Sequence, residues 1–248
     1  MARLYLIRHA QSANNEIWDG SNEHPGRVPD PEITEIGRRQ AETLGQHLAH
    51  PQAEPRQQPF VPSGESHFGL THVYCSLMTR SILTAEYIAG ACELVLHALP
   101  DIFEKHGICD VDDNGNLQGL PGPGQDYFEQ RFPRLKLPQD INADGWWNRP
   151  VEDESAFISR LQNVVAEIRQ RLSASDDRIA LVAHGDFIDQ FINELVGMVR
   201  HQPNYDNHWF ANWTFHNTSI SRIDFVNGSQ NVVYLNRIDH LPNELVTW

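Results

Sequence analysis

Three short apolar runs each lead into polar residues that could do chemistry: residues 3–8, 70–76 and 178–183. The polar residues at or just beyond their ends are Arg8 and His9, then Arg80, and finally His184. If the runs are parallel strands of one sheet, these side chains arrive at the same edge of that sheet. Arginine forks can neutralise phosphate oxygens, and a neutral imidazole nitrogen can attack phosphorus. The four residues therefore favour phosphoryl transfer.

Helical patterns of apolar residues lie between these runs and must position their ends. One begins after Thr34, a residue type that is favoured at helix N-termini. In each pattern the apolar residues recur three or four positions apart, over residues 41–48, 82–92 and 157–172. Because strands that alternate with helices form layered parallel sheets, we predict an α/β fold with three layers, α/β/α, and a mostly parallel sheet.

The C-terminal part of the chain has a different pattern. Residues 219–226 and 231–237 flank the pair Asn227-Gly228, which tolerates the positive φ angles of a tight hairpin. We therefore predict an antiparallel hairpin at the C-terminus. Together with the strand and helix patterns, this indicates a single domain over residues 1–248.

Two long stretches lack a clear periodicity, residues 51–69 and 107–150. Long loops of this kind in a compact domain usually cover a functional site or are disordered. The second stretch contains Trp146 and Trp147, which could line a lid or fix the loop to the body of the protein. We expect a loop insertion over the site at about residues 105–150.

Composition limits the partners of this protein. Its 248 residues include 19 Lys and Arg against 33 Asp and Glu, a formal net charge of -14. This charge repels nucleic acid and anionic lipid, so we expect neither a nucleic-acid partner nor a membrane partner. Only Lys105 and Lys136 are lysines, and the other basic residues are arginines, which suit bidentate contacts to phosphate or carboxylate. An anionic ligand must be held by a local positive cluster.

The cysteines and the hydropathy indicate the compartment. Cys75, Cys92 and Cys109 form no CxxC pair, so we expect neither a disulfide framework nor a thiolate zinc site. No apolar stretch of the sequence approaches the 18 residues of a membrane span. We therefore expect a cytoplasmic protein in a reducing compartment. No HExxH or similar ligand set occurs, and we expect no metal and no other cofactor.

Four ordered segments resemble those of a known family. They are Leu6-Ile7-Arg8-His9-Ala10-Gln11-Ser12 with Asn15, residues 34–41, Ser76-Leu77-Met78-Thr79-Arg80 followed by Thr84-Ala85, and Ala183-His184-Gly185. Together they resemble the histidine phosphatase superfamily, the phosphoglycerate-mutase-like proteins. One departure is Ala10, where the family more often has glycine.

The resemblance implies a two-step reaction through a phosphohistidine on His9, the nucleophile. It also implies that a carboxylic acid in residues 99–107 gives a proton to the leaving group. Glu104 matches the family's carboxylate best, and Asp101 is the alternative. The residues that the resemblance places around the phosphoryl group are Arg8, Arg80 and His184, with neutral contacts from Ser12 and Asn15.

We predict a cofactor-independent phosphomonoester hydrolase that acts on a small phosphorylated substrate. Two alternatives remain open: a phosphoglycerate-type mutase, and a catalytically silent module that binds a phosphorylated ligand. The mutases of this family hold a second phosphate and a carboxylate with a lysine and two adjacent arginines from the region after the acid. The corresponding cations here are Lys105, Arg131, Arg134, Lys136 and Arg149, with no adjacent arginine pair. Residues 117–120 nevertheless resemble a mutase segment.

Overall fold

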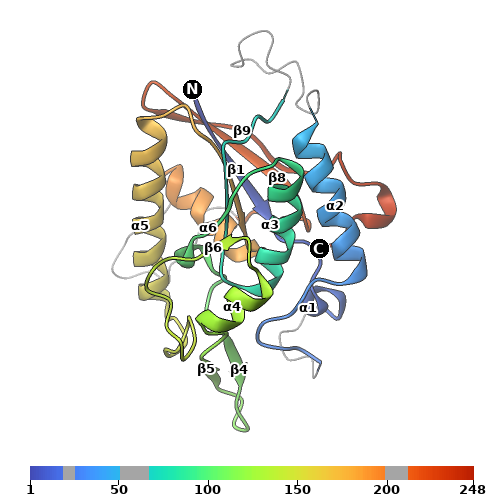
Figure 1. The fold of residues 1–248 in the computed structure, drawn as a ribbon. Helices are drawn as coiled ribbons and strands as arrows, with labels where there is room; N and C mark the ends of the chain where they lie inside the picture. Colours follow the sequence, from blue (N-terminus) through green and yellow to red (C-terminus); the bar gives the residue numbers. More distant parts are fainter. Residues whose placement is uncertain (19–25, 51–66, 199–211) are drawn as a thin grey trace.

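The computed structural model describes residues 1–18, 26–50, 67–198 and 212–248. In these residues a seven-stranded sheet has the order β6-β3-β2-β7-β1-β8-β9 (Figure 1). Its strands are β1 (Ala2–Arg8), β2 (His72–Cys75), β3 (Leu96–Ala98), β6 (Leu135–Lys136), β7 (Arg178–Ala183), β8 (Ile220–Val226) and β9 (Ser229–Arg237). The neighbours from β6 to β1 pair in parallel, whereas β8 and β9 pair antiparallel. The predicted fold class is confirmed.

Helices cover both faces of the sheet. The helices of one face are α2 (Glu35–Ala49) and α3 (Thr79–Ala91), and those of the other are α5 (Glu154–Ser173) and α6 (Gly185–Leu195). Strand β1 supplies side chains to both hydrophobic cores, because successive strand residues point to opposite faces. Tyr5 and Ile7 pack in the core that includes α2 and α3, and Leu4 and Leu6 pack in the core that includes α5 and α6. This alternation produces the three layers.

Two local signals in the sequence correspond to observed turns and caps. The Thr34 side chain accepts a hydrogen bond from the backbone N–H of Gly37, at 3.0 Å, and so caps α2. Asn227 and Gly228 join β8 to β9 with φ angles of 50° and 80°. Both features depend on neighbouring residues alone, which is why the sequence predicts them.

The stretch 107–150 is more regular than the sequence indicates. It contains the hairpin β4 (Cys109–Val111) and β5 (Leu117–Gly119), the helix α4 (Gln125–Arg131) and the edge strand β6. These strands have two or three residues each, too few to establish an apolar period. The hairpin and α4 lie at the end of the molecule toward which β1 runs (Figure 1). Of the other stretch, 51–69, only residues 67–69 are described.

Trp146 and Trp147 fix the stretch 107–150 to the body of the protein. Both side chains are buried, and both contact Phe103 edge-on, at ring-centre distances of 5.8 and 4.7 Å. Trp147 also packs against Gly107, which has a φ of +75°. Between the two roles open to these tryptophans, the packing favours a fixing role.

Replacing Gly107 with alanine is expected to destabilise the protein. The new Cβ would lie 2.3 Å from Cζ2 of Trp147, so the indole must shift. The matched control is Gly115→Ala, because Gly115 also has a positive φ, +82°, but has open space around it. In urea unfolding, Gly107→Ala should lose about 1–3 kcal/mol more than Gly115→Ala, the usual cost of overpacking. Equal losses would show that Trp147 packing contributes nothing.

A membrane span would require a long, apolar helix. None of the helices in the described ranges combines that length with that apolar character.

Candidate active site

The candidate site lies where the parallel strands β1 and β7 end and the helices α3 and α6 begin. His9 directly follows β1, Arg80 lies in the first turn of α3, and His184 directly precedes α6. All three are buried, and the rings of His9 and His184 lie 5.2 Å apart between centres. The sheet therefore brings together residues from three distant parts of the chain, as the strand-end prediction requires.

The hydrogen bonds of His9 define its tautomer. Its Nδ1 lies 2.8 Å from the carbonyl oxygen of Ala10, which can only accept, so Nδ1 carries the hydrogen. Nε2 is then the nitrogen with the lone pair, and it accepts a hydrogen bond from Nε of Arg80 at 3.1 Å. Burial, with the charges of Arg80 and Arg8, lowers the pKa of His9 well below its usual value. The ring is neutral near pH 7, and Nε2 can act as a nucleophile.

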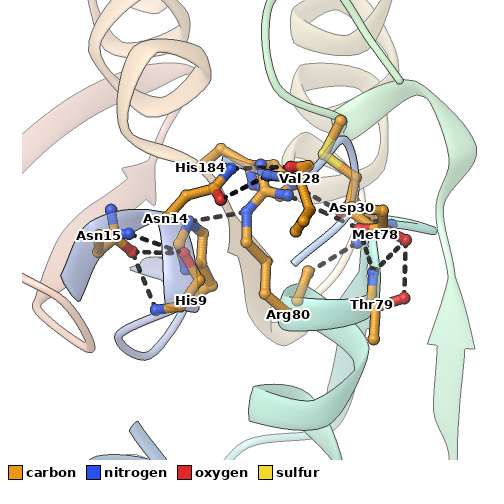
Figure 2. A network of polar contacts seen from close by, with 12 residues as sticks. His9, Asn14, Asn15, Val28, Asp30, Met78, Thr79, Arg80 and His184 are labelled. Atoms are coloured by element: carbon orange, nitrogen blue, oxygen red, sulfur yellow. Dashed lines mark hydrogen bonds and ion pairs between the residues drawn. The ribbon is translucent and has the colours of Figure 1, made fainter. Parts of the chain in front are cut away.

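Arg80 lies between His9 on one side and Asp30 and Thr79 on the other (Figure 2). Its Nη1 is 3.7 Å from Oδ1 of Asp30. Asp30 also accepts hydrogen bonds from the backbone N–H of Thr79, at 3.0 Å, and from the Thr79 hydroxyl, at 2.7 Å. One carboxylate therefore caps the start of α3 and holds the guanidinium of Arg80.

Arg8 and His184 contribute hydrogen-bond donors that the described residues leave unused. Nη1 of Arg8 donates to the carbonyl oxygen of Phe215, whereas its buried Nε has no hydrogen-bond partner among the described residues. Burial lowers the pKa of Arg8 to about 10, so the side chain keeps its charge at neutral pH. A buried donor without a partner is unfavourable, and a bound anion would satisfy it.

His184 is oriented by Ser76. Nε2 of His184 lies 2.7 Å from Oγ of Ser76, which also accepts a hydrogen bond from the backbone N–H of Met78. Among the described hydrogen bonds the Ser76 hydroxyl has no other acceptor for its hydrogen, so we assign that hydrogen to the contact with Nε2 and the imidazole hydrogen to Nδ1. That Nδ1 is buried and has no partner in the described part of the chain. Burial, and then the charges nearby, lower the pKa of His184 well below its usual value, so the ring is neutral.

Glu104 lies at the N-terminus of α6. Its Oε1 accepts the backbone N–H groups of Lys105 and Phe187, both at 3.0 Å, whereas Oε2 has a single long contact of 3.4 Å to the N–H of Asp186. Oε2 is therefore the oxygen with room for a proton. Burial, with the charge of Asp186, raises the pKa of Glu104 to about 7 despite the charge of Arg80 and these hydrogen bonds. A carboxyl group with this pKa can donate and accept protons near neutral pH.

Asp101, the other carboxylate of residues 99–107, lies in a different environment from Glu104. Asp101 is exposed on a short 3-10 helix (Pro100–Ile102). The charge of Glu104, in contrast, acts on both Arg8 and Arg80, where it raises the pKa of each arginine against the larger, lowering effect of burial. The geometry thus favours Glu104 over Asp101 as a proton donor in this site.

Ser12 and Asn15 hold each other at the start of α1 (Ala13–Glu16). They form a reciprocal capping box, with the Ser12 hydroxyl donating to Oδ1 of Asn15 at 2.9 Å. Oδ1 of Asn15 also accepts from Nδ2 of Asn217, at 3.3 Å, and the same Nδ2 donates to the carbonyl oxygen of His9 at 3.1 Å. The Ser12 hydroxyl is therefore engaged within the protein, and the Asn15 amide group remains the better donor for a ligand.

The sequence analysis predicted no role for several residues that contact the site. Asp30 and Asn217 are loop residues, so no periodic signal could have indicated them. Thr84 lies in a motif recognised above, and the structure gives it a contact: its hydroxyl accepts the Ala10 N–H and donates to the carbonyl oxygen of Arg80. Ala10 itself does not have a positive φ, so the absence of glycine there causes no strain.

Replacing Asp30 with alanine is expected to destabilise α3. The loss of a cap costs about 1–2 kcal/mol, and a carboxylate acceptor is at the upper end of that range. Asp30→Asn is the matched control, because its amide oxygen can still accept the Thr79 N–H. In urea unfolding Asp30→Ala should therefore lose more than Asp30→Asn. Two variants of wild-type stability would contradict the capping role.

Ranges 1–18, 26–50, 67–198 and 212–248 contain no cluster of three or more His, Cys, Asp or Glu side chains that could hold a metal ion. Cys75, Cys92 and Cys109 are unpaired thiols, and burial raises the pKa of each.

Comparison with protein families identifies the wider group. The model of the histidine phosphatase superfamily (branch 1) matches residues 4–56 and 64–238. The chain belongs to this superfamily. The resemblance inferred from the residues around His9, Arg80 and His184 is thus confirmed.

Individual proteins and solved structures that are similar to this chain have different names. "Probable phosphoglycerate mutase GpmB" from Yersinia pestis is 24% identical over 225 residues, covering 91% of this chain and 86% of that protein. Phosphoserine phosphatase from Entamoeba histolytica, solved in complex with 3-phosphoglyceric acid, is 19% identical with a TM-score of 0.57, covering 98% and 100% of the two chains. Mycobacterial glucosyl-3-phosphoglycerate phosphatase with VO3 is 17% identical with a TM-score of 0.56, covering 95% and 99%. At these identities the solved structures show a shared fold.

Proposed function

We propose that this protein is a phosphomonoester hydrolase that acts through a phosphohistidine on a small phosphorylated substrate. The observation that carries the proposal is the state of His9. Its Nδ1–H is held by the Ala10 carbonyl, and its Nε2 lone pair lies beside the guanidinium of Arg80. A neutral, oriented imidazole next to a fixed cation suits attack on a phosphoryl group.

In the first step Nε2 of His9 attacks phosphorus and the bond to the leaving oxygen breaks. Arg80 turns its N–H from Nε2 to a phosphoryl oxygen, and the unused donors of Arg8 and His184 stabilise the developing charge. Oε2 of Glu104 gives its proton to the leaving oxygen, so that an alcohol departs. Asn15 adds a neutral contact, and Ser12 holds Asn15 in place.

In the second step water attacks the phosphohistidine. The Glu104 carboxylate accepts a proton from this water while the bond between phosphorus and Nε2 breaks. Inorganic phosphate leaves, His9 is again neutral, and Glu104 is again protonated. Its pKa of about 7 suits both roles, since neither protonation state is strongly disfavoured near neutral pH.

The alternative function is that of a phosphoglycerate-type mutase, which the name of the Yersinia pestis relative favours. A mutase must hold a doubly phosphorylated intermediate with additional cations. Lys105, however, is paired with Glu154 at 2.6 Å, and Arg131 with Glu32 at 2.6 Å. Cations engaged in this way are less available for a second phosphate, which supports hydrolysis.

The remaining cations of the insertion also have neighbours outside the candidate active site. Arg149 lies over the ring of Trp147, 4.0 Å from its centre. Arg134 and Lys136 line a cavity of about 800 Å³ beside α3, together with Glu86 and Glu93. None of the proposed catalytic residues lines that cavity. This distribution again supports the hydrolase.

The decisive experiment supplies 3-phosphoglycerate primed with 2,3-bisphosphoglycerate and follows 2-phosphoglycerate and free phosphate together. We expect phosphate release to exceed isomerisation. Isomerisation that outruns phosphate release would overturn the hydrolase in favour of the mutase. A panel of phosphorylated metabolites, with p-nitrophenyl phosphate included, then identifies the substrate. A protein that binds these compounds and hydrolyses none of them would be a silent binding module.

Removing divalent ions is expected to leave the activity unchanged, because the proposed nucleophile and the groups that hold the phosphate are side chains of the protein. Rates with and without EDTA should agree within error. Activity lost in EDTA and restored by a divalent ion would contradict this mechanism. Vanadate, a mimic of five-coordinate phosphorus, should inhibit. The VO3 complex of the mycobacterial phosphatase makes vanadate a suitable probe.

Two wider inferences accompany this function. We infer that residues 1–248 form one domain, with an insertion at about residues 105–150 that the Arg131–Glu32 ion pair ties to the segment before α2. We also infer a cytoplasmic location, for which the free cysteines are suited.

A further inference from the structure

Arg160 is a buried arginine on α5 whose guanidinium is almost fully used within the protein. Its Nε and Nη2 donate to the two carboxylate oxygens of Glu152, each at 2.7 Å. Its Nη1 donates to the backbone carbonyl oxygens of Asp101, at 2.7 Å, and Phe103, at 3.2 Å. Arg160 and Glu152 therefore form a bidentate ion pair that also grips the backbone just before Glu104.

The aromatic neighbours of Arg160 connect it to both sides of Glu104. Its guanidinium lies over the ring of Phe103, 3.5 Å from the ring centre, and 5.5 Å from the ring centre of Phe187. Phe103 is the residue before Glu104, and the N–H of Phe187 donates to Oε1 of Glu104. One side chain thus packs between the segment that carries Glu104 and the helix end that binds its carboxylate.

Further contacts from Glu154, the first residue of α5, and from Glu152, just before the helix, hold the residues after Glu104. Nζ of Lys105 pairs with Glu154 at 2.6 Å. Nδ1 of His106 lies 3.3 Å from the carbonyl oxygen of Glu152. The segment is therefore held before Glu104 through its backbone carbonyl oxygens and after Glu104 through the side chains of Lys105 and His106.

A buried ion pair is weak evidence of a role in stability. The desolvation of two charges often cancels their attraction, and well-packed apolar side chains can replace such pairs at no cost. What apolar side chains cannot replace is the hydrogen bonding to the two carbonyl oxygens, which fixes backbone position. The arrangement of Arg160 is therefore explained better by positioning than by stability.

We propose that Arg160, oriented by Glu152, is a positioning residue for Glu104: it fixes the backbone at Asp101 and Phe103 so that Oε2 of Glu104 faces the leaving oxygen of the substrate. This inference rests on the proposed function. Arg160 does not touch substrate in it and acts only through Glu104. Proton donation requires the donor and the leaving oxygen to be within about 2.6–3.2 Å, so a small displacement of Glu104 should impair it.

The signature of such a displacement is a dependence on the leaving group. p-Nitrophenyl phosphate has a leaving group that departs as a stabilised anion, with little need of a proton. An alkyl phosphate needs the proton of Glu104. Loss of positioning should therefore slow the alkyl ester selectively, whereas a general loss of folded protein should slow both substrates equally.

The test compares kcat/KM of wild type and Arg160→Lys on p-nitrophenyl phosphate and on an alkyl phosphomonoester. Lysine cannot make the bidentate pair and reach both carbonyl oxygens together. We expect the alkyl ester to lose about 100-fold, the effect of a misplacement of about 1 Å, and p-nitrophenyl phosphate to lose less than about 5-fold. The alkaline limb of the pH profile for the alkyl ester should also change.

Arg222→Lys is the matched control. Arg222 on β8 forms a bidentate pair with Asp224 that is buried even more deeply, with both distances 2.7 Å, and no described hydrogen bond joins it to residues 101–106. It should lose stability without changing the ratio of the two substrates. Glu152→Gln, which keeps the shape of the side chain but removes its charge, should change the ratio in the same direction as Arg160→Lys and serves where Arg160→Lys does not fold.

Equal losses on the two substrates, in Arg160→Lys or in folded Glu152→Gln, would overturn the inference while leaving the proposed function intact. The same change of ratio in Arg222→Lys would also overturn it, because the effect would then be general. A wild-type protein that hydrolyses neither substrate would instead overturn the proposed function, and the inference with it.

Discussion

Replacing His9 with alanine is expected to abolish both phosphate release and covalent labelling. Without the imidazole no positioned nucleophile remains, and the water that would replace it lacks a base at that point. We expect kcat to fall by at least about 10⁴-fold, as in other enzymes that lose the nucleophile of a covalent mechanism. Turnover of p-nitrophenyl phosphate gives the rate, and a brief quench that avoids acid, with labelled substrate, traps the phosphohistidine.

His184→Ala is the control for this experiment. It removes a neighbouring buried imidazole, and with it the phosphate contact that we propose for His184, but keeps Nε2 of His9. The variant should be slow, yet it should still become labelled on His9. Label that persists in His9→Ala and disappears in His184→Ala would assign the nucleophile to His184.

Replacing Glu104 with glutamine is expected to slow an alkyl phosphate by about 10²–10⁴-fold, the usual contribution of general acid catalysis. The amide keeps the shape of the side chain and can accept the N–H groups of Lys105 and Phe187, but it has no proton to give. p-Nitrophenyl phosphate should be affected much less in the first step. The comparison of the two substrates separates loss of the acid from general damage.

The pH dependence of the rate also follows from Glu104. The first step needs Glu104 protonated, and its protonated fraction falls as the pH rises through its pKa of about 7. The wild-type rate on an alkyl phosphate should therefore fall above about pH 7. His9 must be neutral, and since burial lowers its pKa, the acid limb lies well below the usual range of histidine. The two limbs report the macroscopic constants of the coupled site.

In Glu104→Gln the alkaline limb should disappear, because the group that titrates there is gone. Asp101→Asn is the matched control for the alternative carboxylate, and it should keep the wild-type rate and profile. An alkaline limb that survives in Glu104→Gln and is lost in Asp101→Asn would transfer the role of the acid to Asp101.

The sequence by itself determined the framework of this protein. Apolar runs that end at Arg8 and at Ala183 correspond to β1 and β7, and the cap at Thr34 and the turn at Asn227-Gly228 lie where they were predicted. Each of these signals acts within a few residues of the chain, so the local sequence is sufficient to specify it. The order of the motifs around His9, Arg80 and His184 was also sufficient to indicate the family.

Only the tertiary structure decided how the site is completed. Asp30 meets Arg80 across 50 residues of chain, and Arg160 meets Phe103 across 57, contacts that leave no periodic or local trace in the sequence. The choice between Glu104 and Asp101 likewise depends on which carboxylate reaches the N-terminus of α6, which lies some 80 residues farther along the chain. Such contacts depend on how the layers pack against one another. Packing is a property of the whole fold, and that is the physical reason why the sequence indicated His9 and the arginines beside it but not the residues that hold them in place.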